Sequence, residues 1–202
     1  MSRRPSKKMR TSQISRSRAN GEGPEIGALS LTYKEYTAVI KETTTVNQPI
    51  TENIPEQLTE RPQWVCWRYE EREGKETKVP YIAGTNSRAS STELMTWSSF
   101  EYALAAYEAG EPLYDGIGFC FCSADPLCGI DLDGCRNPET GEVAPWAQKI
   151  ISDASDGYIE VSPSKTGVHV IVEGRVRDGG IRRGPVEMYS RDRFFTITGE
   201  VL

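Results

Sequence analysis

The stretch GIGFCFCSADPLCGIDLDG, residues 116–134, contains two short apolar segments bounded by glycine, proline and acidic residues. Apolar runs of this length between turn residues are typical of β-strands. We therefore predict strands at residues 116–122 and 129–133. A short polar connection joins these two strands, and the other elements of the fold are predicted on either side of them.

Further strands and two helices flank this centre. Ser98 and Glu101 have the spacing of a capping box before an apolar helical face, and Gly110 supplies a stop signal. Pro145 suits the first position of a second helix, over residues 145–154. Short apolar segments predict strands at residues 158–161, 168–172, 186–189 and 194–198. Helices interspersed with short strands predict an α+β sheet domain.

The aromatic and β-branched segment at residues 64–69 precedes the charged residues 70–76 and a second extended segment at residues 77–81. This order predicts a β-hairpin with a turn over residues 70–76. Residues 1–53 hold few large apolar side chains, and we expect them to be disordered or weakly structured. The folded domain is then predicted to span residues 54–202.

Charge is distributed unevenly along the 202 residues, which carry a net charge of −5. The basic residues before Glu22, the first acidic residue, are Arg3, Arg4, Lys7, Lys8, Arg10, Arg16 and Arg18. The remainder is therefore strongly acidic and is a poor general binder of nucleic-acid backbones, so any contact with nucleic acid must be local. No apolar run is long enough to span a membrane, and no secretory signal follows the basic start, so we expect an intracellular, cytoplasmic protein. The five cysteines are an odd number, which favours reduced thiols in the core.

The clearest candidate site is the pair Asp131 and Asp133, since alternation along a strand places both carboxylates on one face and Ile130 and Leu132 toward the core. Two close carboxylates repel each other unless a cation lies between them, and hard divalent cations prefer oxygen ligands. The alternative is a strand that ends in exposed aspartates. An EF-hand register fails because Arg136 replaces the required glycine, and the cysteine spacing contains no C-x2-C pair for zinc.

A second candidate is the hydroxyl-rich loop SPSKTGVH, residues 162–169, which leads into an apolar strand. Its backbone N–H groups, hydroxyls and lysine could bind an anion, as in a phosphate nest, although the P-loop pattern is absent. His169 is the only histidine. The candidate phosphate-binding residues of the loop are Ser162, Ser164, Lys165, Thr166, Gly167 and His169.

Glu187 and Arg193 are the last candidates. Glu187 lies inside a predicted strand, where a carboxylate needs solvent or a metal. Arg193 precedes the last strand and could form a bidentate contact with phosphate oxygens. An exposed strand residue and a surface salt bridge are the alternative interpretations of these two.

Taken in order, the D-x-D pair, the S-x-S-x-T-G-x-H loop and the strand carboxylate resemble the three motifs of the archaeo-eukaryotic primase superfamily. The chain is most similar to primase-polymerase domains of phages, plasmids and mobile elements. The further segments that carry the resemblance are RPQWVCWR (61–68), KVPY (78–81), TWSSF (96–100), DGIGF (115–119) and RFFTITG (193–199). The resemblance implies an RRM-like sheet with flanking helices and an N-terminal αβ hairpin unit.

The resemblance also implies site roles. Asp131, Asp133 and Glu187 would hold Mg2+ or Mn2+, the loop with His169 would bind the triphosphate of an incoming nucleotide, and Arg193 would add a phosphate contact. Arg68 and Lys78 are carried over as possible template or nucleotide contacts. The implied substrates are nucleoside triphosphates and a single-stranded DNA template or primer-template.

Two departures from the pattern leave other functions open. Lys165 stands where such loops often have glycine, and related replication proteins continue into helical and helicase regions, so a helicase domain or protein is an expected partner. A metal-dependent nuclease could use the same carboxylates and histidine. A nucleic-acid-binding module without catalysis is the other alternative.

Overall fold

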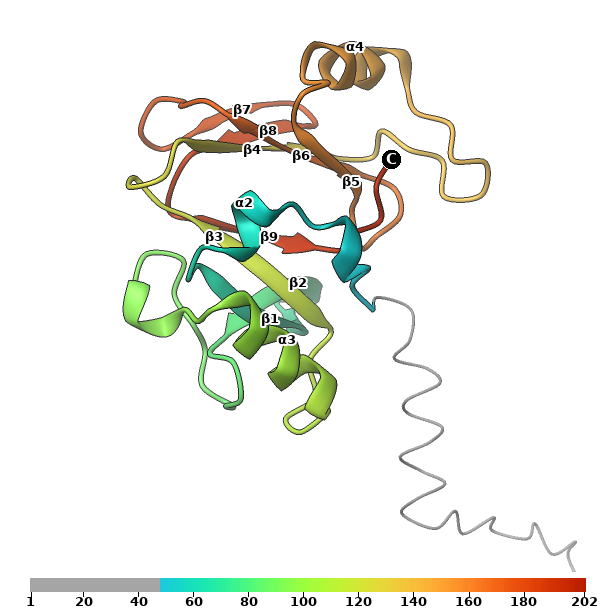
Figure 1. The fold of residues 1–202 in the computed structure, drawn as a ribbon. Coiled ribbons are helices and arrows are strands. Elements are labelled where there is room, and N and C mark those ends of the chain that lie inside the picture. Colours follow the sequence, from blue (N-terminus) through green and yellow to red (C-terminus); the bar gives the residue numbers. More distant parts are fainter. Residues whose placement is uncertain (1–47) are drawn as a thin grey trace, which may run out of the picture.

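The computed structural model describes residues 48–202 (Figure 1). Most of the tail predicted at residues 1–53 lies outside the described residues. The described chain begins with a 3-10 turn, η2 (Thr51–Asn53), and a short helix, α2 (Glu56–Thr59). The backbone N–H of Ile50 donates to Thr198, and the side chain of Asn53 donates to Gly199, so the folded part begins before the predicted boundary at residue 54.

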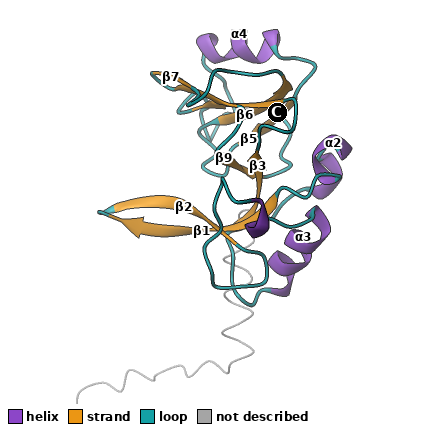
Figure 2. Cartoon of the chain, turned by 90° about the vertical axis from the view of Figure 1, so that its left-hand side faces the viewer, coloured by secondary structure: helices purple, strands orange, loops and turns teal. Residues whose placement is uncertain are grey.

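The first sheet has four antiparallel strands in the order β2-β1-β3-β9. Their bounds are β1 (Trp64–Arg72), β2 (Lys75–Tyr81), β3 (Gly116–Phe121) and β9 (Arg193–Ile197). The β1–β2 hairpin projects sideways from the body of the molecule (Figure 2). Helix α3 (Phe100–Ala109) packs against β1 and β3, and the 3-10 turn η3 (Leu94–Thr96) precedes it.

The second sheet has five antiparallel strands in the order β5-β6-β4-β8-β7. Their bounds are β4 (Leu127–Leu132), β5 (Tyr158–Val161), β6 (Val168–Glu173), β7 (Ile181–Arg183) and β8 (Val186–Tyr189). Helix α4 (Pro145–Asp153) covers the outer face of this sheet, and the first sheet lies on its other side (Figure 1). The α+β class is therefore confirmed, with few helices around antiparallel sheets.

Two apolar clusters support these layers. The larger joins α3, the first sheet and the inner face of the second sheet, through side chains such as Trp64, Phe119 and Ile171. The smaller packs Ile130, Leu132 and Val168 beneath α4. As predicted, Ile130 and Leu132 face a core. Four of the five free cysteines are buried, whereas Cys122 is half-buried.

Several local predictions were wrong. The charged residues 70–76 are not a turn, since strands β1 and β2 extend through them to a two-residue turn at Glu73 and Gly74. Both turn residues have positive φ, 53° and 73°, which matches the tight turns that suit the twist of a hairpin. The cap of α3 is Ser99 rather than Ser98, because the Ser99 hydroxyl accepts from the N–H of Tyr102. Strand β7 has too few apolar residues to have been predicted.

None of the helices within residues 48–202 is both long and apolar enough to span a membrane.

Candidate active site

One row of side chains crosses all five strands of the second sheet. Glu160 on β5 pairs with His169 on β6, His169 pairs with Asp131 on β4, and Asp131 pairs with Glu187 on β8. Arg182 on β7 completes the row opposite Glu187. Directly opposed residues of antiparallel strands share a face, with Cβ atoms about 4.5–5.5 Å apart. The sheet register therefore places the candidates from three distant motifs side by side.

Asp131 occupies the centre of this row and is half-buried, with 27% of its side chain exposed. Its Oδ1 lies 3.9 Å from Nε2 of His169. Burial raises the pKa of Asp131, and the His169 side chain opposes this effect, whereas the carboxylates of Asp133 and Glu187 raise the pKa further. Burial is the largest of these effects, so a cation bound to the carboxylate would stabilise the ionised form.

Asp133 lies just beyond the strand rather than within it. Strand β4 ends at Leu132, one residue earlier than predicted, and Asp133 belongs to the following turn. Its backbone N–H still donates to the carbonyl of Pro185 at 2.8 Å, which continues the pairing toward β8. Asp133 is exposed and follows Asp131 by one strand period, so its carboxylate stays on the same side of the sheet.

Glu187 is held by two neighbours. Its Oε1 lies 3.3 Å from Nε of Arg182, and its Oε2 accepts from the hydroxyl of Tyr189 at 2.7 Å. Arg193 on β9 donates to the same Tyr189 hydroxyl at 3.1 Å, with its guanidinium 4.6 Å from the ring centroid. Arg193 is thus linked to Glu187 through Tyr189. Sequence reasoning missed both neighbours: Tyr189 lies one strand period from Glu187 on β8, whereas the register of β7 and β8 brings Arg182 to it.

The donor set suits a hard cation, because carboxylate oxygens are the ligands that Mg2+ and Mn2+ prefer. Within residues 48–202, no three His, Cys, Asp or Glu side chains lie close enough together to form a closed metal site. The direction of Glu187 is one reason, since its carboxylate points to Arg182 and Tyr189. A metal bound by all three predicted ligands requires Glu187 to exchange these partners for the ion.

His169 is buried, and its orientation is defined from two sides. Its Nδ1 lies 3.1 Å from Oε1 of Glu160, and its ring lies against Phe195 with centroids 5.0 Å apart. Glu160 is fully buried and was missed by sequence reasoning. The available signal was its place in a four-residue apolar strand, where a carboxylate needs partners.

The loop between β5 and β6 presents a chain of hydroxyls next to His169. The Ser164 hydroxyl lies 3.0 Å from those of both Ser162 and Thr166. A Cβ on Gly167 would lie only 3.0 Å from the Leu132 carbonyl and the Ser162 hydroxyl, so a larger residue here would crowd the loop against the end of β4. Lys165 has a positive φ of 63° and forms an ion pair with Glu200.

Arg136 was not expected to support this loop. Its backbone N–H donates to Thr166 at 2.9 Å, and its guanidinium donates to the carbonyl of Lys165 at 3.0 Å. Arg136 follows the turn that contains Asp133. It therefore fixes the loop relative to the carboxylates.

The two hairpin candidates lie on opposite faces of the first sheet, since Tyr69 pairs with Lys78 and Arg68 pairs with Val79. Burial lowers the pKa of Lys78, and the carboxylates of Asp131, Asp133 and Glu160 oppose this effect. Lys78 is therefore within electrostatic reach of the row.

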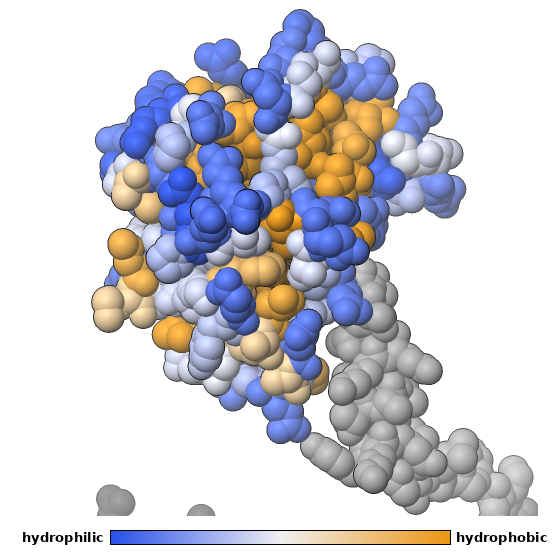
Figure 3. Space-filling model, in the orientation of Figure 1, coloured by the Kyte–Doolittle hydropathy of each residue, from blue (hydrophilic) through white to orange (hydrophobic). Residues whose placement is uncertain are grey.

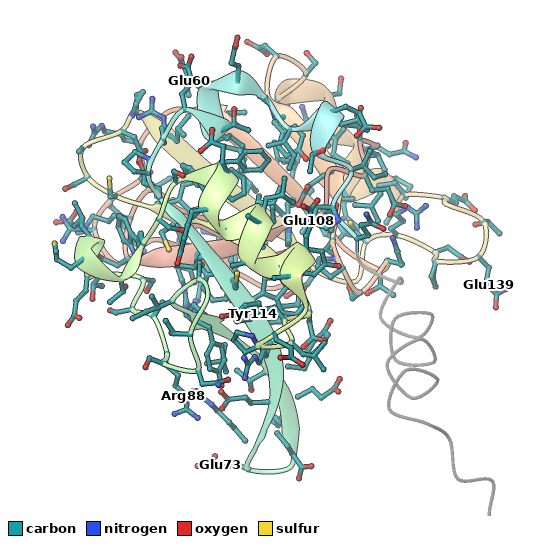
Figure 4. The ribbon with its side chains drawn as sticks, turned by 60° about the horizontal axis from the view of Figure 1, so that its bottom comes forward. Glu60, Glu73, Arg88, Glu108, Tyr114 and Glu139 are labelled. Carbon is teal, nitrogen blue, oxygen red and sulfur yellow. The ribbon has the colours of Figure 1, made fainter. Side chains whose placement is uncertain are left out.

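Arg68 is held elsewhere. Its guanidinium lies 4.4 Å and 4.8 Å from the ring centroids of Tyr81 and Tyr114, and it donates to Asn86. Figure 4 shows Tyr114 along the hairpin and Glu73 at the hairpin tip. The structure thus brings Lys78, but not Arg68, toward the carboxylates.

A separate apolar groove runs between α2 and α4, where Figure 3 shows hydrophobic residues at the surface. It is lined by residues such as Leu58, Ile130 and Ile150, with Asp153 and Glu173 at its edges. None of the candidate site residues lines this groove. The candidate chemistry therefore lies on the row and loop rather than in the groove.

The fold and the order of its motifs define a primase-polymerase type of domain. No model of a known protein family matches the chain. The chain is 33% identical over 152 residues to the DNA Primase-polymerase of Nitratiruptor phage NrS-1, an alignment that covers 71% of this chain and 20% of that protein. The chain therefore belongs to the primase-polymerase family, as its motifs indicated. It aligns with about a fifth of the length of this curated relative.

Proposed function

We propose that the chain catalyses template-directed nucleotidyl transfer, as a DNA primase or polymerase that uses nucleoside triphosphates. The observation that carries this proposal is the row across the second sheet, in which Asp131 lies between His169 and Glu187. The hydroxyl loop before His169 lies at the end of the same strands. Carboxylates for metal and donors for phosphate are thus neighbours, as phosphoryl transfer requires.

Most of the chemistry is positioning and charge stabilisation, because phosphoryl transfer needs little covalent help from protein groups. Bound Mg2+ or Mn2+ would neutralise phosphate charge and stabilise the attacking and leaving oxygens. Asp131, Asp133 and Glu187 are the ligands that we assign to these ions.

We assign the groups on the β6 side of Asp131, opposite to Glu187, to the triphosphate. Ser164 and Thr166 offer hydroxyls, and Nε2 of His169 faces Asp131 from the adjacent strand. Lys78 contributes a positive charge from the hairpin. A local set of donors beside bound metal allows a domain with an acidic surface to bind an anionic substrate.

The DNA partner is proposed to be a single-stranded template or a primer-template. The phage origin of the relative supports a role in the replication of a virus or mobile element. We place that role in the cytoplasm, and we retain a helicase domain or protein as a proposed partner.

The test is primer extension by the full chain with Mn2+ or Mg2+, together with calorimetric titration of a nucleoside triphosphate in the presence of Mn2+. We expect incorporation by the native protein and none by Asp133→Asn. The matched control is Asp156→Asn, at an exposed aspartate between α4 and β5, which should retain activity. Cleavage of DNA without triphosphate binding would support a nuclease instead. DNA binding with neither activity would support a module without catalysis.

A further inference from the structure

Glu160 is the most deeply buried charged side chain of the described domain, with an exposed fraction of 0%. It lies on β5, at the end of the row, and β6 with His169 separates it from Asp131 on β4. A buried carboxylate is costly unless its oxygens are fully hydrogen-bonded. Its contacts therefore indicate what this carboxylate does.

The two carboxylate oxygens have different partners. Oε2 accepts from the Tyr158 hydroxyl at 2.7 Å and from the backbone N–H groups of Thr198 and Gly199 at 2.8 and 2.9 Å. The Thr198 hydroxyl lies 3.1 Å from the same oxygen. Oε1 lies 3.1 Å from Nδ1 of His169. Oε2 is thus surrounded by donors from Tyr158, Thr198 and Gly199, and Oε1 accepts from the histidine.

This arrangement fixes the histidine ring. A carboxylate accepts hydrogen bonds, so Nδ1 of His169 must carry the proton that lies between the two side chains. Phe195 restricts the ring from its face, with centroids 5.0 Å apart. With Nδ1 engaged, Nε2 remains directed toward Asp131, 3.9 Å away.

We propose that Glu160 is a positioning residue that accepts from Nδ1–H of His169 and so holds the ring with its Nε2 edge directed at the bound triphosphate. This inference rests on the proposed function for the triphosphate itself. Glu160 does not touch substrate, and it acts only through the histidine. Partners of this kind fix the tautomer and orientation of a histidine, and their loss typically costs about 10–100-fold in affinity or activity at metal sites.

A purely structural role is the alternative, because Glu160 also ties β5 to the end of β9 through Thr198 and Gly199. The two roles belong to different oxygens of Glu160, since Oε1 contacts His169 whereas Oε2 makes the contacts to the end of β9. Tyr158→Phe removes a hydrogen bond to Oε2 and leaves the His169 contact in place. It is the matched control for loss of stability without loss of histidine positioning.

The first test is nuclear magnetic resonance of the untagged full chain labelled with 15N-histidine. Because His169 is the only histidine, one pair of imidazole nitrogen signals reports its state. We expect a proton on Nδ1 in the native protein and in Tyr158→Phe, and loss of that preference in Glu160→Gln. An Nδ1 without a proton in the native protein would overturn the proposal, and this result does not depend on any variant folding.

The second test is a double-mutant cycle read as the dissociation constant of a nucleoside triphosphate with Mn2+ and as kcat/KM. Glu160→Gln should weaken both about tenfold or more, yet change neither by more than about twofold in a His169→Ala background. Tyr158→Phe should lower Tm while leaving both within about twofold of native. Additive effects in the cycle, or native affinity in a folded Glu160→Gln, would overturn the proposal.

The outcomes also separate this inference from the proposed function. If the native chain binds no triphosphate, the proposed function fails, together with the assignment of Nε2 to phosphate. If His169→Ala weakens triphosphate binding while Glu160→Gln does not, the proposed function stands and Glu160 has only a structural role.

Discussion

Replacing Asp131 by asparagine should make the metal-free protein more stable and less responsive to metal. The change keeps the size of the side chain and removes one negative charge from a half-buried position directly opposite Glu187. At about 5 Å, two like charges repel by about 1 kcal/mol in water and about 3 kcal/mol at an effective dielectric constant of 20. His169 and Lys78 offset this repulsion, and burial of the carboxylate is the main cost that remains, so we expect no more than the lower figure.

The pH dependence has a defined sign. The pKa of Asp131 is raised in the folded protein, mainly by burial. A carboxyl group of this kind stabilises the fold at pH below its unfolded pKa, and that stabilisation is lost as the pH rises through the folded pKa. The advantage of Asp131→Asn should therefore be present at pH 7 and disappear as the pH falls toward the ordinary range for aspartate, about 3.9.

The assay is thermal unfolding with EDTA and with added Mn2+. A gain of about 1 kcal/mol corresponds to a rise in Tm of about 2–4 °C for a domain of this size. Metal at a hundred times its dissociation constant stabilises by about 2.7 kcal/mol, so native protein should gain roughly 5–10 °C with Mn2+. Asp131→Asn should gain much less, and the control Asp156→Asn should behave as native. A lower metal-free Tm in Asp131→Asn, with an undiminished response to Mn2+, would refute the assignment.

Three further outcomes are expected. His169→Ala should raise KM and lower kcat, with kcat/KM reduced about 10–100-fold. Lys165→Ala should lower kcat/KM by less than about threefold, because the Lys165 ammonium is paired with Glu200. Equal losses of kcat/KM in steady-state kinetics would contradict this ranking. Hydrogen bonds from Arg88 and Tyr81 lower the pKa of Glu70 to about 2. Glu70→Gln should therefore reduce Tm at pH 7, and the difference in Tm from native should shrink as the pH falls from about 4.5 toward 2. A difference in Tm that does not change with pH would count against the contact. Deleting residues 1–20 should flatten the salt dependence of DNA binding, since their charged side chains are all basic. Filter binding with an unchanged salt slope would show that the tail makes no phosphate contacts.

Elements with strong local signals could be predicted from the sequence. Helix α4 begins at Pro145 as predicted, and β5 and β8 have the predicted bounds. The hairpin turn was wrong because charged residues between two apolar segments look like a loop, whereas this hairpin projects from the body and its strands can carry charge on both faces. Strand β7 is added to the sheet by pairing with β8, which is a tertiary interaction that its own sequence does not signal.

The candidate site was only partly predictable, because the spacing of residues along one strand can be read from the sequence but the alignment of neighbouring strands cannot. Asp131 and Asp133 follow from the period of one strand, which is local. That Asp131 lies opposite both His169 and Glu187 depends on the register of three strands. Glu160 could not be assigned, because all of its partners except Tyr158 come from β6 and from the end of β9.

The apolar side chains under α4 determine that register. Ile130 pairs with Val170 and Met188, and Leu132 pairs with Val168 and Val186, so the outer face of β4 and its neighbours is apolar at each of these positions. A slip of one residue in any of these strands would turn a charged side chain toward α4 and an apolar one toward the carboxylates. Burial beneath α4 therefore excludes these one-residue slips and keeps the aspartate, histidine and glutamate together on the inner face. It follows that a polar substitution at Leu132, whose side chain faces α4 and not the candidate ligands, should disturb the site as well as the core.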